Sequence, residues 1–345
     1  MNALCVGVLG AGPVTQAIHL PSLARLPELF TVSTVMDPDL ATAQCVADRV
    51  GATATDSLAD VVADAAIDVV AVCSPPQFHA AQVIAACRAG KRAVLCEKPF
   101  ATTREEAAEM ARVAEETGVP VVAGAMHTYD PGWLRFAEAW GPLPGSAQHI
   151  RLSTVLPPNQ RFEDFATEVS RRPDSPGPAG DPAAVLTMGI LGLATHDLPI
   201  IRRLLSDPSD VVIHQVRLLS PFGYLIVFTS GSHTVELHAH MSGNWAPRWS
   251  LELLTQERVG TVDFTPSYVQ AGSATSSIST DGQQLSYPPA EDNGYLGEWR
   301  HIYRVAHGGP VLYPPAELVA DLTFALDLAE AATAALPAHS SDGAP

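Results

Sequence analysis

Short apolar runs alternate with longer amphipathic stretches over the first third of the chain. The runs are rich in Val, Leu, Ile and Ala, and they predict buried strands at residues 4–9, 30–36, 67–73, 93–96 and 119–123. The stretches between them predict helices at residues 14–26, 40–50, 79–89 and 103–117, the last with a capping box from Thr103 to Glu106. Such alternation is typical of a parallel sheet with right-handed crossovers, so residues 1–124 are predicted to form one doubly wound domain.

The pattern changes in the second part of the chain. Apolar and polar residues alternate at residues 149–156, 211–219, 224–229, 234–241, 250–255 and 260–264, which predicts a largely antiparallel sheet with one covered face. Helices predicted at residues 131–139, 194–205 and 315–336 would supply the cover. Residues 125–336 are therefore predicted to form a second domain of α+β type.

Two segments lack an apolar period. Residues 157–182 are rich in Pro, Gly, Arg and Asp and predict an irregular excursion, for which a lid over a cleft is one interpretation. Residues 337–345 predict a flexible tail.

Composition narrows the class of protein. The 345 residues are 47% hydrophobic and 17% charged, which argues against global disorder and against a fibrous protein. The formal net charge of −17 disfavours nucleic acid and anionic membranes as partners and leaves small molecules. No apolar run reaches the roughly 18 residues of a bilayer span, and residues 1–10 lack the pattern of a signal peptide. We therefore expect a cytoplasmic protein.

All five cysteines lie in the first hundred residues, an odd number without a CxxC pair. This spacing argues against a disulfide framework and against a structural zinc site. Cysteines inside apolar runs, as here, usually behave as small buried hydrophobic residues.

A glycine-rich turn follows the first predicted strand. Gly10 and Gly12, with Pro13 and Val14 after them, would let the backbone approach a pyrophosphate at the start of a helix. Thr15 replaces the third glycine of the usual dinucleotide fingerprint.

An acidic residue closes the second predicted strand. Asp37 is placed to accept hydrogen bonds from ribose hydroxyls and to repel a 2′-phosphate, although Asp37-Pro38-Asp39 also favours a simple turn. NAD(H) is therefore the expected cofactor, with NADP(H) left open.

Two proline-stiffened strand exits are predicted to meet at one crevice. Ser74, Pro75 and His79 follow the third strand, and Glu97 and Lys98 follow the fourth. Because ligands bind beyond the carboxyl ends of parallel strands, all five are candidates for seating a dinucleotide. Lys98 is also a catalytic candidate, since a partly buried amine can hold a substrate hydroxyl and transfer its proton.

These motifs together resemble one family. The chain contains GAGPV at residues 10–14, HLP at 19–21, DPD at 37–39, SP at 74–75 with His79, EKP at 97–99, YDP at 129–131 and THDL at 195–198. The set resembles the glucose-fructose oxidoreductase / inositol dehydrogenase (Gfo/Idh/MocA) family over roughly the whole chain. The resemblance implies a Rossmann domain followed by a large, mainly antiparallel open-faced sheet, and an NAD(P)-dependent dehydrogenase or reductase acting on sugars, cyclitols or related molecules. It also implies a homodimer or homotetramer formed through the second sheet. By the same resemblance, Lys98 would contact the nicotinamide ribose and the substrate, and Pro99 would fix the strand exit of Lys98 through a cis bond.

One position departs from the family pattern. Sugar dehydrogenases of this type carry an aspartate four residues before the active-site histidine, and Gly192 stands there in this chain, before His196. His196 and Lys98 are then the predicted proton-transfer groups, and Asp197 is expected to be a helix residue or an indirect partner. The missing aspartate leaves two alternatives, a cofactor-binding protein without redox turnover and an enzyme that uses bound NAD transiently for elimination or hydrolysis.

Further candidates carry weaker signals. His127 and Tyr129 stand where family members often have an arginine, so they are candidate substrate contacts. His238 and His240 share a strand face near His233, but the spacing is common by chance and no metal site is expected. Residues 293–303 hold three aromatics and predict a helix over the sheet or a substrate wall.

Overall fold

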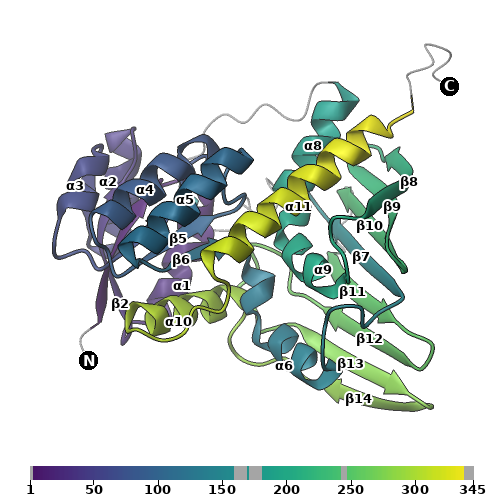
Figure 1. Cartoon of the computed structure of the whole chain (residues 1–345). Helices are drawn as coiled ribbons and strands as arrows, with labels where there is room; N and C mark the ends of the chain where they lie inside the picture. Colours follow the sequence, from purple (N-terminus) through teal and green to yellow (C-terminus); the bar gives the residue numbers. More distant parts are fainter. Residues whose placement is uncertain (1–2, 159–168, 171–180, 242–246, 338–345) are drawn as a thin grey trace.

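The computed structural model describes residues 3–158, 169–170, 181–241 and 247–337 of the chain. The predicted lid falls largely on residues 159–168 and 171–180, and the predicted tail on residues 338–345, so both lie outside the described residues. The described chain forms two units, each built on one sheet (Figure 1).

The first unit is a six-stranded parallel sheet in the order β3-β2-β1-β4-β5-β6. Its strands are β1 (Leu4–Leu9), β2 (Phe30–Met36), β3 (Thr53–Thr55), β4 (Val69–Val72), β5 (Ala93–Glu97) and β6 (Val121–Gly124). Its helices are the π-helical turn η1 (Thr15–His19), α1 (Leu20–Ala24), α2 (Leu40–Val50), α3 (Leu58–Ala63), the 3-10 turn η2 (Pro76–Phe78), α4 (His79–Arg88) and α5 (Arg104–Thr117). Strand order reverses between β1 and β4, which places the topological switch point beside the glycine turn.

The predicted strands and helices of this unit are confirmed, with two additions. The sequence pattern missed β3 and α3, which are only 3 and 6 residues long. The capping box of α5 also differs in detail. Thr103 Oγ1 accepts the Glu106 amide at 3.1 Å as expected, but the Glu106 carboxylate accepts the amide of Thr102, one residue before the cap, at 3.0 Å.

The second unit is an eight-stranded sheet in the order β14-β13-β12-β11-β7-β10-β9-β8. Its strands are β7 (His149–Leu156), β8 (Val211–Leu218), β9 (Gly223–Ser230), β10 (His233–Met241), β11 (Arg248–Leu254), β12 (Arg258–Asp263), β13 (Thr275–Thr280) and β14 (Gln283–Tyr287). Only β7 and β10 pair in parallel among these strands as described, so the expected mainly antiparallel sheet is confirmed.

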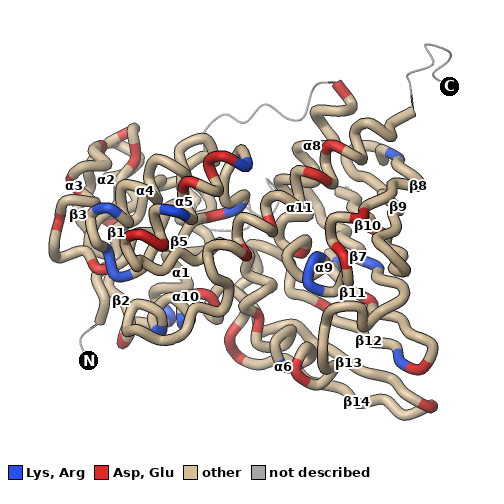
Figure 2. Tube along the Cα trace, viewed as in Figure 1, with Lys and Arg blue, Asp and Glu red and all other residues tan. Residues whose placement is uncertain are grey.

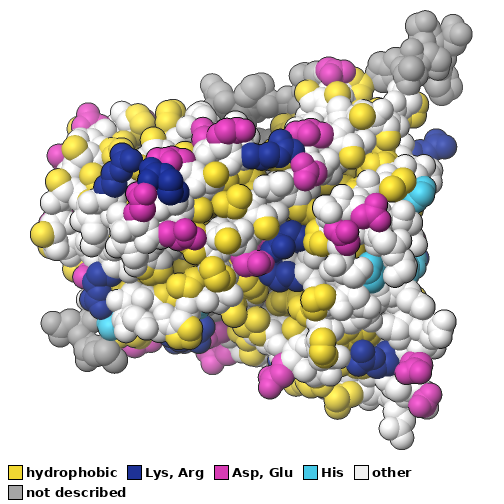
Figure 3. All heavy atoms as spheres, viewed as in Figure 1, with side chains coloured by type: hydrophobic (Ala, Val, Ile, Leu, Met, Phe, Trp, Pro, Cys, Tyr) yellow, Lys and Arg dark blue, Asp and Glu magenta, His cyan; other side chains and the backbone are white. Residues whose placement is uncertain are grey.

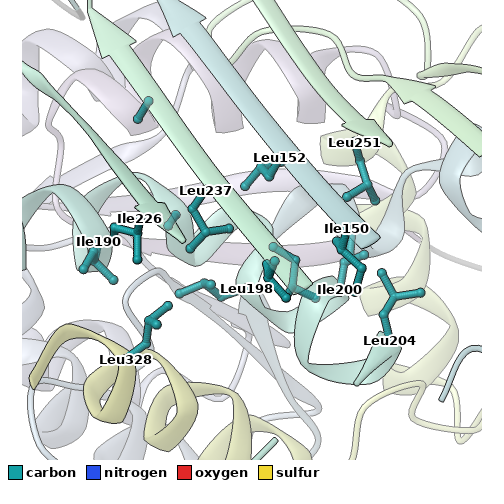
Figure 4. Packing of buried hydrophobic residues seen from close by; sticks show 14 of the residues in the cluster. Ile150, Leu152, Ile190, Leu198, Ile200, Leu204, Ile226, Leu237, Leu251 and Leu328 are labelled. Atoms are coloured by element: carbon teal, nitrogen blue, oxygen red, sulfur yellow. The ribbon is translucent and has the colours of Figure 1, made fainter. Parts of the chain in front are cut away.

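Helices cover one face of this sheet, because nearly every second residue of its central strands is apolar and points to that face. Buried residues of β7, β9, β10 and β11 point toward apolar side chains from the helices, as Figure 4 shows for Leu237, Ile226, Ile190 and Leu328. The covering elements are η3 (Met126–Tyr129), α6 (Pro131–Trp140), α8 (Pro182–Gly192), η4 (Ala194–His196), α9 (Leu198–Leu204) and α11 (Pro315–Ala334). Each fully buried side chain of this kind contributes roughly 1.5–3 kcal/mol.

Two late helices join the units. The helix α10 (Gly294–Ala306), expected over the second sheet, instead places Leu296, Trp299 and Ile302 against the first sheet. The helix α11 contacts both cores, through Leu322 in the first and Leu328 in the second. The chain therefore returns to its first unit after building the second, and this fixes the two sheets relative to each other.

Acidic residues are spread over both units, in keeping with the net charge of −17 (Figure 2). Within the described ranges, no single helix is both long and apolar enough to cross a membrane. One helix pair, Pro182–His196 with Leu198–Leu204, meets the length and composition test together but bends by 74°. Leu186, Ile190 and Ile201 of this pair are buried in the core of the second unit.

Candidate active site

The glycine turn has the backbone geometry that its sequence predicts. Gly10 has a φ of +97°, and a Cβ there would lie 2.8 Å from the backbone of Cys73 and Ser74, so only glycine fits between the first strand and the β4 exit. A Cβ at Gly12 would meet nothing within 4 Å, which leaves open space on that side of the turn. Thr15 donates its hydroxyl to the Gly10 carbonyl at 2.5 Å and so holds the turn from behind.

Asp37 is bound to the same turn. One carboxylate oxygen accepts the amide of Ala11 at 2.9 Å, and the other accepts the amide of Asp39 at 3.0 Å. A carboxylate has about four acceptor sites, so capacity remains for further hydrogen bonds from ribose hydroxyls. The negative charge thus lies at the wall of the turn.

A groove of about 950 Å³ runs along this turn. Seven of the predicted cofactor contacts line it, namely Gly10, Gly12, Pro13, Val14, Asp37, Ser74 and Pro75. Its volume lies at the upper end of the range typical for ligand and cofactor sites. The room at Gly12, the mainly apolar lining and the carboxylate at one end fit a dinucleotide.

His79 and Glu97, also predicted as cofactor contacts, lie behind the groove. His79 is 1% exposed, and its two ring nitrogens lie 2.9 Å from the Pro99 carbonyl and 2.8 Å from the Ser74 carbonyl. It therefore ties the β4 exit to the β5 exit. Glu97 is buried, and its carboxylate binds the His19 ring at 2.9 Å and the amide of Lys98 at 3.0 Å.

The His19–Glu97 pair links the glycine-turn helix to the end of β5. Burial alone would lower the pKa of His19, but its partners, Glu97 among them, hold that pKa well above the ordinary value. Burial alone would raise the pKa of Glu97, but His19 and Lys98 lower it. The hydrogen bond of this pair fixes the residue that precedes Lys98.

Lys98 reaches across to the second unit. Its Nζ donates a hydrogen bond to the carbonyl oxygen of Gly192 at 2.8 Å, and the Lys98–Pro99 peptide bond is cis, as the family resemblance implies. Burial lowers the pKa of the Lys98 amine, against the opposite effect of the Glu97 charge. A Cβ at Gly192 would meet nothing within 4 Å, so the absence of the family aspartate is not forced by packing.

His196 lies on the same side of the second unit, four residues after Gly192. It is 7% exposed, and its Nδ1 is buried without a hydrogen-bond partner among the described residues. Burial, and after it the positive charge of Lys98, holds the pKa of His196 well below the ordinary value. The imidazole is therefore neutral near pH 7 and can accept a proton.

Asp197, expected to be a helix residue or an indirect partner, organises a buried cluster beside His196. One of its carboxylate oxygens accepts His127 Nδ1 at 2.7 Å, and the other accepts Trp249 Nε1 at 2.8 Å. The His127 ring stacks on Phe264 with 4.0 Å between ring centroids and lies 6.0 Å from the His196 ring. His127, a predicted substrate contact, is thus 2% exposed and lies behind His196.

Tyr129, the other predicted substrate contact, is 3% exposed. Its ring stacks on His301 at 5.3 Å and meets Tyr313 edge-on at 5.5 Å. It lines a cavity of about 40 Å³ between the units, which Lys98 also lines. Figure 3 shows hydrophobic side chains along the depression between the two units on this side of the molecule.

Among the described residues, no group of three His, Cys, Asp or Glu side chains could hold a metal ion. His238 is engaged with Ser153 at 3.0 Å, and His240 with the Ser220 carbonyl at 3.0 Å.

Sequence reasoning missed several parts of the site. Met36, Thr42, Phe78 and Gln82 line the groove, and Phe78 is 49% exposed at its rim. Phe78 lies in the segment after the third predicted strand, which is β4, so its place beyond a strand end marked it as a possible cofactor contact. No local sequence signal predicts the pairing of His127 with Asp197, because the two residues are 70 positions apart.

A family model described as an oxidoreductase family with an NAD-binding Rossmann fold matches residues 4–125. Inositol 2-dehydrogenase 3 from Saccharopolyspora erythraea is 39% identical over 134 residues, which is 39% of each chain. D-glucoside 3-dehydrogenase from Escherichia coli is 37% identical over 118 residues, 34% of this chain and 33% of that protein. The chain thus spans about two fifths or less of the length of these curated relatives.

Solved structures match over almost the whole chain. The UDP-N-acetylglucosamine 3-dehydrogenase from Acidithiobacillus ferrooxidans superposes with a TM-score of 0.74 at 20% identity, covering 97% of this chain and 99% of that chain. A 3-ketoreductase from Actinomadura kijaniata in complex with NADP gives 0.70 at 18% identity, covering 95% and 97%. The two-unit fold is therefore shared with these proteins. Residues 4–125 therefore match an oxidoreductase family with an NAD-binding Rossmann fold, and the relatives of known activity match the same part of the chain.

Proposed function

We propose that the protein is an NAD(P)-dependent oxidoreductase that transfers hydride between a nicotinamide and a hydroxyl-bearing or carbonyl carbon. The substrate class is a sugar, a cyclitol or a related polyhydroxylated small molecule. The observation that carries the proposal is the meeting of Lys98, from the Rossmann unit, with the segment of His196, from the second unit, beside the groove of the glycine turn. The names and activities of the relatives support the same reaction class.

The residues of the groove would seat the dinucleotide. Gly10 and Gly12 leave the backbone free to approach the pyrophosphate, and Asp37 would accept the ribose hydroxyls. When bound, the nicotinamide supplies the site that accepts or donates the hydride. The Asp37 carboxylate would repel a 2′-phosphate, so we propose that NAD(H) is preferred over NADP(H).

Lys98 and His196 would handle the substrate oxygen. The Lys98 ammonium would donate a hydrogen bond to that oxygen and stabilise the negative charge that develops on it during oxidation. The neutral His196 imidazole would accept the proton of the hydroxyl group, and it would return the proton when a carbonyl is reduced. The lowered pKa of Lys98 also brings its own proton within reach of transfer.

Gly192 favours a second candidate function. Without a carboxylate at this position, the site holds less acid-base machinery than the family pattern implies, and bound NAD would then act as a transient oxidant for elimination or hydrolysis, or serve binding alone. The three functions differ in what accumulates. Net oxidoreduction changes the nicotinamide absorbance, transient oxidation forms product without that change, and a binding protein forms neither.

The test is a panel of cyclitols, aldoses and their keto forms incubated with NAD or NADH, with absorbance and product mass both followed. We expect absorbance change and product together for at least one substrate. Lys98→Met and His196→Asn, which remove the proposed proton-handling groups, should each lower kcat by about 100-fold or more while cofactor binding by His196→Asn stays unchanged. Full activity of His196→Asn would remove His196 from the mechanism.

We also propose that copies of the chain associate through the second sheet. The face away from the helices carries Leu225, Val227 and the 41% exposed Val259 beside the Arg151–Glu236 ion pair, and Figure 1 shows no described helix over it. Sedimentation of the purified protein should show a dimer or tetramer, and Val259→Glu should lower its mass. A monomer at micromolar concentration would contradict this.

A further inference from the structure

Asp197 holds His127 in one defined orientation. Its two oxygens accept hydrogen bonds from His127 Nδ1 at 2.7 Å and from Trp249 Nε1 at 2.8 Å, and the carboxylate is 2% exposed. A carboxylate only accepts, so this contact places a proton on Nδ1 of His127 and leaves Nε2 as the ring nitrogen without a partner among the described residues. A carboxylate that fixes a histidine tautomer in this way is the arrangement that activates a proton acceptor in many hydrolases.

Two ring nitrogens in this cluster have no partner. Nε2 of His127 and Nδ1 of His196 are both buried and make no hydrogen bond to any described residue. The ring centroids are 6.0 Å apart and the rings are tilted by 47°. Buried polar atoms are almost always paired, and one water bridging the two nitrogens would satisfy both of them.

The cluster lies where the chain lacks the family aspartate. Lys98 occupies the space next to Gly192 through its bond to the Gly192 carbonyl, and its charge acts on His196 from the other side. The charged groups around the two rings are Asp197 and Asp130 near His127, and Lys98 near His196. The Asp197 carboxylate therefore reaches His196 only through the His127 ring.

We propose that Asp197 and His127 form a proton relay behind His196 and take over the role of the carboxylate that position 192 lacks. This inference rests on the proposed oxidoreductase function. His196 is the residue that meets the substrate, and His127 and Asp197 are positioning residues that act through it.

The relay moves one proton for each hydride. On oxidation, the substrate O–H bond breaks and its proton joins Nε2 of His196, while a bound oxidised nicotinamide would supply the acceptor for the hydride from the carbon that bears this oxygen. A proton leaves Nδ1 of His196 and joins Nε2 of His127 through one bridging water. The resulting His127 imidazolium is stabilised by the Asp197 carboxylate at 2.7 Å. Reduction of a carbonyl runs the same steps backward.

The activity test compares Asp197→Asn with a packing control. The asparagine keeps the size of the side chain but offers a single acceptor oxygen for two donors, and it cannot stabilise an imidazolium. We expect kcat to fall about 100-fold with KM and NADH affinity changed less than about 3-fold, and the pH profile of kcat to shift. Phe264→Leu removes only the ring stacked on His127 and should change kcat less than about 3-fold. Equal losses in both variants, or an unchanged kcat in Asp197→Asn, would overturn the relay.

A second measurement needs no turnover. In protein labelled with ¹⁵N in its histidines, ring ¹H–¹⁵N spectra report which nitrogen carries the proton. We expect a proton on Nδ1 of His127 and on Nδ1 of His196 near pH 7, and we expect the His196 signals to move in both Asp197→Asn and His127→Gln. A proton on Nε2 of His127, or His196 signals that ignore both substitutions, would overturn the inference. Absence of any turnover in the wild type, with these spectra as expected, would instead overturn the proposed function.

Discussion

Glu298 carries a buried carboxyl group that its surroundings do not compensate. The residue is fully buried in α10, and neither carboxyl oxygen has a hydrogen-bond partner within the described chain. Burial, and next the negative charge of Glu97, raises the pKa of Glu298 well above the ordinary 4.5, and the nearby His19 only partly opposes this. The folded protein therefore keeps this proton where the unfolded chain releases it.

This difference sets a slope of stability against pH. Above about pH 4.5 the unfolded state loses the proton and the folded state retains it, so the free energy of unfolding falls as the pH rises. The loss is about 1.4 kcal/mol for each pH unit until the pH passes the folded-state pKa, where this contribution levels off. For a chain of this length, that corresponds to a fall in Tm of about 2 °C per pH unit.

Glu298→Gln removes the titrating group and keeps its shape. The difference in Tm between variant and wild type should therefore be constant below pH 4.5. Above that pH, the Tm of the variant should rise relative to that of the wild type. Differential scanning calorimetry from pH 4 to pH 8 measures this difference. The matched control is Glu291→Gln at an exposed position, which makes the same change in net charge and should show no such trend. Parallel Tm curves for Glu298→Gln and wild type would show that the Glu298 carboxyl group does not keep its proton in the folded protein.

Three substitutions test other parts of the site. Asp37→Ser removes the charge that faces a 2′-phosphate, so the ratio of NADP to NAD affinity, measured by fluorescence titration, should rise at least about 10-fold. Gly192→Asp adds a carboxylate near Lys98 and should move the alkaline limb of the kcat profile up by roughly one pH unit, while Gly192→Asn should not. Gly10→Ala meets backbone at 2.8 Å and should abolish NADH binding in calorimetry, whereas Gly51→Ala, which meets nothing within 4 Å, should cost only about 1 kcal/mol of stability.

The first unit was predictable because its signals are local. Buried strands of four to seven residues, the glycine turn and the strand-closing Asp37 are each encoded within a few positions, and their meeting at one edge follows from parallel topology. The same logic located Lys98. The sequence could not separate residues that line the groove from residues that lie behind it. Asp37 and His79 both follow strand ends, but only the side chain of Asp37 lines the groove.

Local sequence patterns predict the second unit less completely than the first. The strands β13 and β14 contain TSSIST and QQLSY, whose serines, threonines and glutamines hide the alternation that marks other strands. The helix α8 is apolar on nearly all sides, so it offers no helical period. The apolar face of α10 was visible, but nothing in the sequence states that it packs on the first sheet.

The candidate site depends most on contacts between distant positions. Lys98 meets Gly192 across 94 positions, and His127 meets Asp197 across 70. The sequence identified Lys98 and His196 individually and marked Gly192 as unusual. Only the fold shows that the buried carboxylate of Asp197 binds His127, whose ring lies beside that of His196.

The central claim is that the amine of Lys98 and the imidazole of His196 serve hydride transfer at a bound nicotinamide. The most direct test supplies NADH with both C4 hydrogens replaced by deuterium, together with a panel of keto-sugars and cyclitol ketones, and follows the label by mass spectrometry. We expect deuterium on the carbinol carbon of the product in wild-type protein and about 100-fold less labelled product in Lys98→Met. Product formed without deuterium, or labelled product at the wild-type rate in Lys98→Met, would contradict it.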